Sequence, residues 1–193
     1  DRREMIVQEH VPLAPRTTLG VGGAARFFAL AETIEDIRQA LAFARSLSLP
    51  VFTLGGGSNI VIADGGWDGL VLAPRLSELT FEKREDAVRV TAGAGIVWDE
   101  LVAETASRGL IGIECLSGIP GTVGGAVVAN LGAYGAQCSD TFVHAEVLDT
   151  QDESGTLHIL QKEVCDFSYH DSRFGRARGR YLVLRATFSL TTA

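Results

Sequence analysis

The stretch GIECLSGIPGTVGGAVVANLGAYG, residues 112–135, contains seven glycines and only one charged residue, Glu114. Glycine allows positive φ angles and lets other atoms approach the backbone closely. We therefore predict a tight turn at residues 117–126 that leads into a short helix. The N–H groups at a helix N-terminus attract anions, but a buried helix with small residues at its contacts explains the pattern equally well.

A second glycine-rich cluster follows the strand predicted at residues 50–54 and reads Gly55, Gly56, Gly57, Ser58 and Asn59. Successive glycines can bring several N–H groups to one point, and such a nest binds phosphate without a lysine. An ordinary glycine-rich turn is the alternative. The cluster matches neither the Walker A loop nor the dinucleotide-binding GxGxxG pattern. Two loops suited to phosphate in one chain favour a dinucleotide over a mononucleotide.

Outward from these loops, the first part of the chain follows a β-α-β pattern. We predict strands at residues 26–30, 50–54, 60–63 and 69–73, and a helix at residues 33–48. Thr33 and Asp36 are spaced as in a capping box. The strands on either side of the helix are expected to be parallel. This part forms a first lobe, residues 1–76.

The second lobe, residues 77–193, is predicted to have more strands than helices. Two strands flank a polar turn at residues 83–86, a hairpin surrounds residues 154–155, and a last strand covers residues 180–190. A helix at residues 97–108 ends at a glycine, Gly109, which is the usual residue after a helix C-terminus. The fold class is therefore α+β.

Composition limits the partners of the chain. A net charge of −7 argues against nucleic acid, because phosphate backbones require a basic face. No apolar run approaches the roughly 20 residues of a membrane helix, and the N-terminal residues lack a signal-peptide core. We therefore expect no membrane partner and a cytoplasmic location. The sequence leaves the oligomeric state open.

The remaining candidates for chemistry favour structural roles. Three widely spaced cysteines indicate neither a disulfide framework nor a zinc site, and we expect Cys115 and Cys165 to be packed thiols. The histidines have no metal-ligand spacing, so no metal is predicted. Trp67 and Trp98 are expected to be packing residues.

Five segments, taken together, resemble the successive motifs of the UDP-N-acetylmuramate dehydrogenase family. They read TLGVGGAARFFAL, LGGGSNIVIAD, AGAGIVWDEL, SGIPGTVGGAVVANLGAYG and FSYHDSRF. They occur in the family's order and extend from about residue 17 to about residue 190. The GGGSN motif paired with IPGTVGGAVVANLGAYG is the specific part of the resemblance.

The resemblance implies a vanillyl-alcohol-oxidase-type fold, in which two α/β lobes hold FAD between them. It implies NADPH-dependent reduction of UDP-N-acetylglucosamine enolpyruvate, an early step of peptidoglycan synthesis. It also assigns cofactor-binding residues, which are Gly55, Gly56, Gly57, Ser58, Asn59, Gly118, Ile119, Pro120, Gly121, Thr122, Gly124, Gly125 and Ala126. By the same resemblance, Asn130 and Tyr134 lie towards the substrate, and Tyr169 and His170 belong to the catalytic motif.

Two departures from the family pattern bear on activity. The family has arginine at the position of His170, and imidazole lacks the bidentate fork of guanidinium. If residues 169–174 are extended, Arg173 faces away from His170. Arg176 could reach over from a loop, but we do not expect it to replace the missing arginine.

The family also has a C-terminal substrate domain that carries a proton-donating serine and a glutamate. The sequence stops before that domain, so we expect a fragment. A natural FAD- or nucleotide-sugar-binding module without turnover and the FAD subunit of another oxidoreductase are the alternatives.

Overall fold

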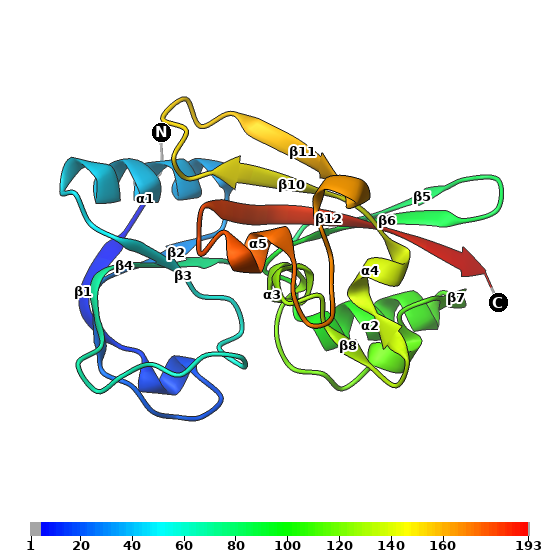
Figure 1. The fold of residues 1–193 in the computed structure, drawn as a ribbon, viewed down its shortest axis with the longest axis horizontal. Coiled ribbons are helices and arrows are strands. Elements are labelled where there is room, and N and C mark those ends of the chain that lie inside the picture. Colours follow the sequence, from blue (N-terminus) through cyan, green and yellow to red (C-terminus); the bar gives the residue numbers. More distant parts are fainter. Residues whose placement is uncertain (1–4, 193) are drawn as a thin grey trace. The chain divides into compact units, whose positions relative to one another are not determined.

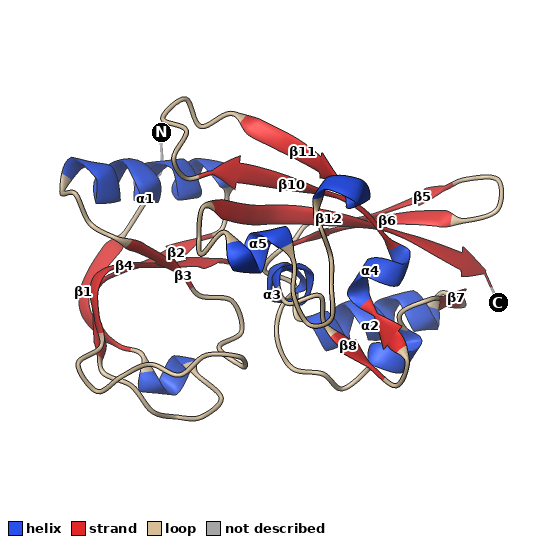
Figure 2. Cartoon of the chain, in the orientation of Figure 1, coloured by secondary structure: helices blue, strands red, loops and turns tan. Residues whose placement is uncertain are grey.

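The computed structural model describes residues 5–192, which form two compact units. The first unit ends at Leu76 and the second begins at Ser77. Figure 1 traces the elements in chain order, and Figure 2 separates helices from strands. Each unit has its own sheet and its own apolar core.

The first unit contains a four-stranded sheet with the order β1-β2-β4-β3. Its elements are β1 (Val7–Pro12), η1 (Ala14–Arg16), β2 (Ala24–Ala31), α1 (Ile34–Ser46), β3 (Val51–Thr53) and β4 (Trp67–Pro74). Both β2 and β3 pair with β4 in parallel, whereas β1 runs antiparallel to β2. The predicted parallel arrangement of the strands flanking the helix is confirmed, although β4 lies between them.

Helix α1 begins where the sequence predicts. The Thr33 side chain accepts from the Asp36 N–H at 3.0 Å, and the Asp36 carboxylate accepts from the Thr33 N–H at 2.9 Å. This reciprocal capping box satisfies two of the N–H groups that a helix start leaves without partners. Four side chains spaced for one helix face are buried, namely Ile37, Ala40, Leu41 and Ala44.

The strand predicted at residues 60–63 is wrong. These residues form an irregular segment with Val61 exposed. The backbone carbonyl of Ala63 accepts from Gly66 across a turn and from the distant Gly23, and neither donor belongs to a strand. A short apolar run predicted a strand, but here Ile60 and Ile62 pack against the first core without joining the sheet.

The second unit contains a six-stranded sheet with the order β11-β10-β12-β6-β5, in which β7 also pairs with β12. Every pairing in it is antiparallel. Its strands are β5 (Leu79–Lys83), β6 (Val88–Gly93), β7 (Leu110–Ile111), β10 (Phe142–Asp149), β11 (Leu157–Gln161) and β12 (Tyr181–Thr192). The two predicted hairpins and the last strand are confirmed.

Helices and short segments connect these strands. They are α2 (Trp98–Ser107), η2 (Glu114–Leu116), α3 (Val123–Val128), β8 (Gly132–Ala133), β9 (Ala136–Gln137), α4 (Cys138–Thr141), η3 (Lys162–Val164) and α5 (Arg173–Arg176). Helix α2 ends as predicted, with Gly109 at a φ of +69°. In the core, the Trp98 ring meets Phe188 edge to face, and its indole N–H donates to the Leu116 carbonyl at 3.0 Å. Trp98 is therefore the packing residue that the sequence predicts.

The cysteines divide into two environments. Cys138 and Cys165 are buried, and burial raises the pKa of the Cys165 thiol to about 12. Cys115 is exposed, so its predicted packing is wrong. In the one turn of η2, Leu116 faces the core and its neighbour Cys115 faces outward.

Residues 5–192 contain neither a cluster of metal-binding side chains nor a membrane-spanning helix. No three His, Cys, Asp or Glu side chains among them gather as metal ligands. No helix in this range is long and apolar enough to cross a membrane.

Candidate functional site

The first glycine cluster, residues 55–59, is a loop at the end of β3. Leu54 closes the strand by donating its N–H to the Leu72 carbonyl at 2.8 Å. Gly57 then takes a φ of +69°, and a Cβ atom there would lie 2.1 Å from the Arg16 carbonyl oxygen. The Gly57 carbonyl accepts from the Thr18 N–H at 3.0 Å, which ties the loop to residues 16–18. Only glycine fits this position.

The donors of this loop are available for a ligand. Among residues 5–192, the backbone N–H groups of Gly55, Gly56, Gly57 and Asn59 have no acceptor. Gly56 and Asn59 are exposed. Backbone donors without protein partners normally bond to water or a ligand, so the loop is able to hold an anion.

The second glycine loop, residues 117–126, differs in this respect. The Val123 N–H donates to the Ile96 carbonyl at 2.9 Å, and the Gly124 N–H donates to the Ala94 carbonyl at 3.0 Å. The Gly125 N–H is capped by the Thr122 hydroxyl at 3.4 Å. Of the two alternatives that the sequence leaves open, these bonds favour the packed helix, because the N–H groups of Val123, Gly124 and Gly125 all have acceptors in the protein. The donors are satisfied because residues 94–96 run alongside the helix start.

Residues 94–99 hold most of this loop. The Trp98 N–H donates to the Gly121 carbonyl at 3.0 Å, so the loop is joined to the start of α2. One carboxylate oxygen of Asp99 accepts from the Gly118 N–H at 2.6 Å and from the Ser117 hydroxyl at 3.0 Å. Asp99 was not among the site residues predicted from the sequence. Its place directly after Trp98 in the AGAGIVWDEL motif was the available signal.

Part of the second loop remains accessible. Gly125 is exposed, and the nearest atom to a Cβ placed there is the Thr122 hydroxyl oxygen at 3.7 Å. A Cβ at Gly118 would meet open space, although its φ of +75° favours glycine. The N–H groups of Ile119 and Gly121 have no acceptor within the described part of the chain. This loop can therefore admit a flat group close to its backbone.

The two predicted substrate residues have contrasting environments. Asn130 is buried, and its amide donates to the Gln137 side chain at 3.1 Å and to the Ser168 carbonyl at 2.8 Å. Its carbonyl oxygen accepts from the Ser139 N–H at 3.0 Å. Tyr134 is 89% exposed in the turn between β8 and β9. Asn130 thus has a structural role in this state, whereas Tyr134 is free to contact a ligand.

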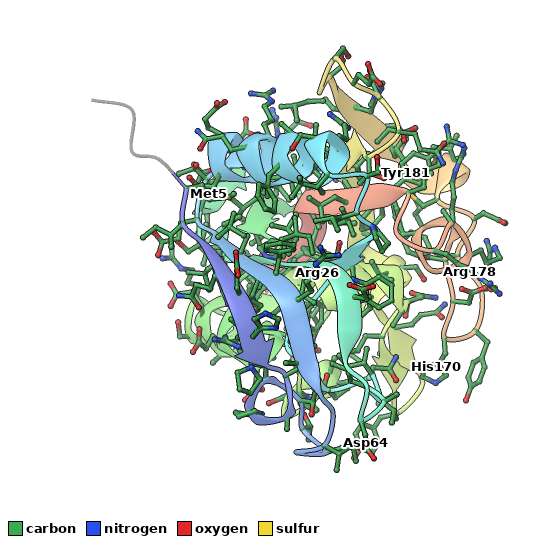
Figure 3. All side chains as sticks on the ribbon, turned by 90° about the vertical axis from the view of Figure 1, so that its left-hand side faces the viewer. Met5, Arg26, Asp64, His170, Arg178 and Tyr181 are labelled. Carbon is green, nitrogen blue, oxygen red and sulfur yellow. The ribbon has the colours of Figure 1, made fainter. Side chains whose placement is uncertain are left out.

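Tyr169 and His170 form the tip of a two-residue turn. Ser168 and Asp171 exchange backbone hydrogen bonds on either side of it, at 3.0 and 3.2 Å. His170 has a φ of +49° and lies at the surface, and Tyr169 is 87% exposed. Figure 3 labels His170 at this surface. The stretch is therefore not extended, so the condition under which Arg173 would face away from His170 is not met.

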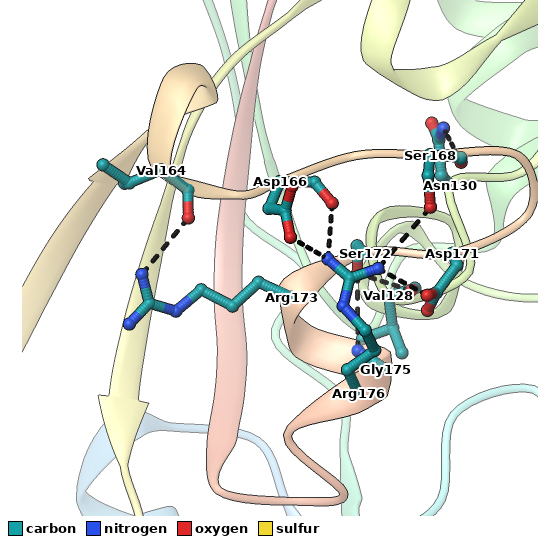
Figure 4. A network of polar contacts seen from close by, with 10 residues as sticks. All are labelled: Val128, Asn130, Val164, Asp166, Ser168, Asp171, Ser172, Arg173, Gly175 and Arg176. Atoms are coloured by element: carbon teal, nitrogen blue, oxygen red, sulfur yellow. Dashed lines mark hydrogen bonds and ion pairs between the residues drawn. The ribbon is translucent and has the colours of Figure 1, made fainter.

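Arg176, in α5, holds this turn from its base (Figure 4). Its guanidinium bonds to the Asp171 carboxylate at 2.5 Å and to the carboxylate and backbone carbonyl of Asp166 at 2.5 and 2.7 Å. These contacts lower the pKa of Asp171 and raise that of Arg176. Arg176 is thus committed to two carboxylates and is not placed to replace the arginine absent at His170.

Comparison with known proteins supports an assignment to a family. A family model described as FAD binding domain matches residues 25–160. The UDP-N-acetylenolpyruvoylglucosamine reductases of Pseudomonas aeruginosa and Thermobifida fusca are 40% and 44% identical to the chain. Those matches cover 96% and 94% of the chain but 54% and 51% of the relatives. The chain therefore spans about half the length of these curated relatives.

Solved structures agree with this result. The UDP-N-acetylenolpyruvylglucosamine reductase of Thermus caldophilus superimposes with a TM-score of 0.79 at 32% identity, covering 98% of this chain and 64% of that one. A VAO-type flavoprotein of Myceliophthora thermophila gives a TM-score of 0.67 at 19% identity, with 88% and 32% coverage. The vanillyl-alcohol-oxidase-type fold and the α+β class predicted from the sequence are confirmed.

Proposed function

This chain belongs to the FAD binding domain family, and we propose that it is the FAD-binding part of an NADPH-dependent reductase. The proposed substrate is UDP-N-acetylglucosamine enolpyruvate, which would be reduced to UDP-N-acetylmuramate for peptidoglycan synthesis in the cytoplasm. The observation that carries the proposal is the match over nearly the whole chain to proteins named as this reductase.

The residues present fit FAD in two respects. In the loop at residues 55–59, the backbone N–H groups of Gly55, Gly56, Gly57 and Asn59 have no acceptor within residues 5–192, which suits a pyrophosphate. The exposed backbone at Gly125 leaves room for a flat ring. We propose that Gly55 to Asn59 bind the pyrophosphate and that Gly118 to Ala126 support the flavin. FAD, when bound, supplies hydride transfer, while the protein supplies binding and orientation.

The turn at Tyr169 and His170 is the proposed catalytic element. Its exposed side chains are available to a substrate, and Arg176 fixes its base through carboxylates on both sides. His170 can donate one hydrogen bond to an oxygen that gains charge, but it lacks the paired donors of arginine. Tyr134, also exposed, is proposed to contact the UDP-sugar, and Asn130 to hold the turn through the Ser168 carbonyl.

One observation favours a second function. Because His170 lacks the two parallel donors of guanidinium, it stabilises an oxyanion less well. A module that binds FAD without reducing this substrate is therefore the second candidate. It shares the FAD site with the first candidate and differs only in the response to the enolpyruvyl sugar.

The test is visible absorption of the purified chain, reconstituted with FAD and kept free of oxygen. Under the reductase proposal, NADPH bleaches the flavin band and the enolpyruvyl UDP-sugar restores it. A band that bleaches but does not recover is expected both of the FAD-binding part of a reductase and of the binding module, and repeating the titration with the family's C-terminal substrate domain joined to the chain distinguishes the two. Absence of a flavin band after reconstitution contradicts both candidates.

A further inference from the structure

An open cavity in the second unit lies outside the glycine loops and has a volume of about 400 Å³. It lies beside η3, α5 and the start of β12, so its walls come from one contiguous part of the chain. Seven residues line it, namely Val164, Asp166, Arg173, Arg176, Ala177, Arg180 and Tyr181. Three of the seven are arginines, and only one carries a negative charge.

Two of the three arginines are fixed by carboxylates. Arg180 bonds to Asp149 through Nε at 3.0 Å and Nη2 at 2.9 Å, and this contact raises the pKa of Arg180. Arg176 is held by Asp166 and Asp171. Two nitrogens of each guanidinium contact carboxylate oxygens, and these charge-assisted bonds restrict the side chain. Arg176 and Arg180 therefore form defined walls of the cavity, and their charges are largely balanced.

Arg173 has no such balance. Its guanidinium donates to the Val164 carbonyl at 3.3 Å and to the Tyr181 hydroxyl at 3.4 Å, both neutral acceptors at long distances. Its Cζ atom lies 5.4 Å from the centre of the Tyr181 ring. Among the described residues, no carboxylate forms an ion pair with it. Figure 4 shows this side chain extended toward Val164 and separate from the Arg176 network.

The surrounding segment is basic within an acidic protein. Five of the 17 basic residues lie between Lys162 and Tyr181, compared with three acidic ones, although the whole chain carries a net charge of −7. An anion is therefore drawn to this region more than to the rest of the surface. Arginine presents five donors in a planar fork, of which Arg173 uses two weakly.

We propose that this cavity binds the phosphoryl group of a small phosphorylated molecule, with Arg173 as its principal ligand. A phosphoryl group accepts hydrogen bonds from the paired donors of the guanidinium. It also supplies the negative partner that Arg173 lacks. Arg176 and Arg180 border the same space from fixed positions. The proposal does not depend on the proposed reductase activity, because it uses only residues of this cavity.

The test is a site-resolved NMR titration of the whole chain with inorganic pyrophosphate and, separately, with uridine monophosphate. Signals of the Arg173 Nε–H and the Ala177 and Tyr181 amides report the cavity, while the amides of residues 55–57 report the glycine loop independently. We expect saturable shifts at the cavity signals. Arg173→Gln should weaken this binding at least tenfold, and Arg173→Lys should weaken it less.

The matched control is Arg178→Gln, because Arg178 is exposed on the same segment but does not line the cavity. It should change the affinity less than twofold. If both ligands shift the cavity signals, the cavity accepts the phosphoryl group of a nucleotide. If pyrophosphate alone shifts them, the cavity accepts a free inorganic anion. The proposal is overturned if neither ligand causes saturable shifts of the cavity signals. It is also overturned if Arg178→Gln weakens binding as much as Arg173→Gln does.

Discussion

The two glycine-rich loops look alike in sequence and differ in structure. In the first, residues 55–59, the N–H groups of four residues have no acceptor among the described residues. In the second, residues 117–126, the N–H groups of Gly118, Val123, Gly124 and Gly125 all donate to acceptors in the protein. Glycine serves an open nest in one loop and close backbone packing in the other.

The difference shows that glycine content does not identify an anion site by itself. What decides is where each backbone donor is directed. The first loop is held through the Gly57 carbonyl, and the N–H groups of Gly55, Gly56, Gly57 and Asn59 have no acceptor among the described residues. The second is held through four of its donors, so its contribution to a cofactor must come from close approach at Gly125 and from the remaining N–H groups of Ile119 and Gly121.

The largest effect is expected from Gly57→Ala, which attacks the anchor of the open loop. The new Cβ would lie 2.1 Å from the Arg16 carbonyl oxygen, at a φ of +69°. We expect a loss of about 3 kcal/mol in the free energy of unfolding, measured by urea denaturation. Gly65→Ala is the control, since no atom lies within 4 Å of its Cβ. Equal stability of the two variants would refute the anchoring role of Gly57.

Substitutions at the adjacent Gly124 and Gly125 of α3 test whether one glycine serves core packing and the other serves the approach of the cofactor. A Cβ at Gly124 would lie 2.9 Å from the Ala94 Cβ, so Gly124→Ala should cost about 1–2 kcal/mol of stability. Gly125→Ala should preserve or raise stability, by up to about 1 kcal/mol, because alanine favours helix. Yet Gly125→Ala should weaken FAD binding about tenfold, measured by quenching of flavin fluorescence. If both variants bind FAD as the unmodified chain does, the second loop does not contact the cofactor.

Asp99→Ala tests the side-chain hydrogen bonds that hold the second loop. It removes the acceptor of the Gly118 N–H and the Ser117 hydroxyl, and we expect a loss of about 1 kcal/mol in unfolding free energy. Amide hydrogen exchange at Gly118 should become faster, whereas exchange at Gly57 should not change. Glu100→Ala, at an exposed neighbouring position, is the control. Unchanged exchange at Gly118 would rule out Asp99 as the tie.

Acid should loosen a third loop, residues 166–171, without affecting the open nest. Arg176 lowers the pKa of Asp171, so the ion pair contributes stability above the unfolded pKa of about 3.9. That contribution is lost as pH falls through the still lower folded pKa. Amide signals of Tyr169 and His170 should therefore broaden or shift below about pH 4, while those of residues 55–57 stay constant. If the amide signals of residues 55–57 change over the same pH range, the Asp171–Arg176 ion pair does not act on residues 166–171 alone.

Local patterns in the sequence were sufficient for much of the fold. Thr33 and Asp36 signalled the start of α1, and Gly109 signalled the end of α2. The errors concern partners far along the chain. Residues 60–63 form a short apolar run, but they join no strand, and the Ala63 carbonyl accepts from Gly66 in a turn and from the distant Gly23.

The candidate site was predictable in its residue types but not in its bonding. Asp99 and Gly118 are 19 residues apart, so no local pattern reveals their bond. The left-handed backbone at His170 was equally hidden, because histidine rarely takes that conformation. The roles assigned to the glycine loops and to His170 stay predictions until ligand binding is measured.

The attachment of residues 117–124 to residues 94–99 has a consequence for protein engineering. The second glycine loop, grafted from this protein into another scaffold, would lose the carbonyls of Ala94 and Ile96 and the carboxylate of Asp99. The transplanted loop would then have to find new acceptors or collapse onto its own glycines. The smallest portable unit is therefore two separate segments, which must be exchanged together when chimaeras of this family are built.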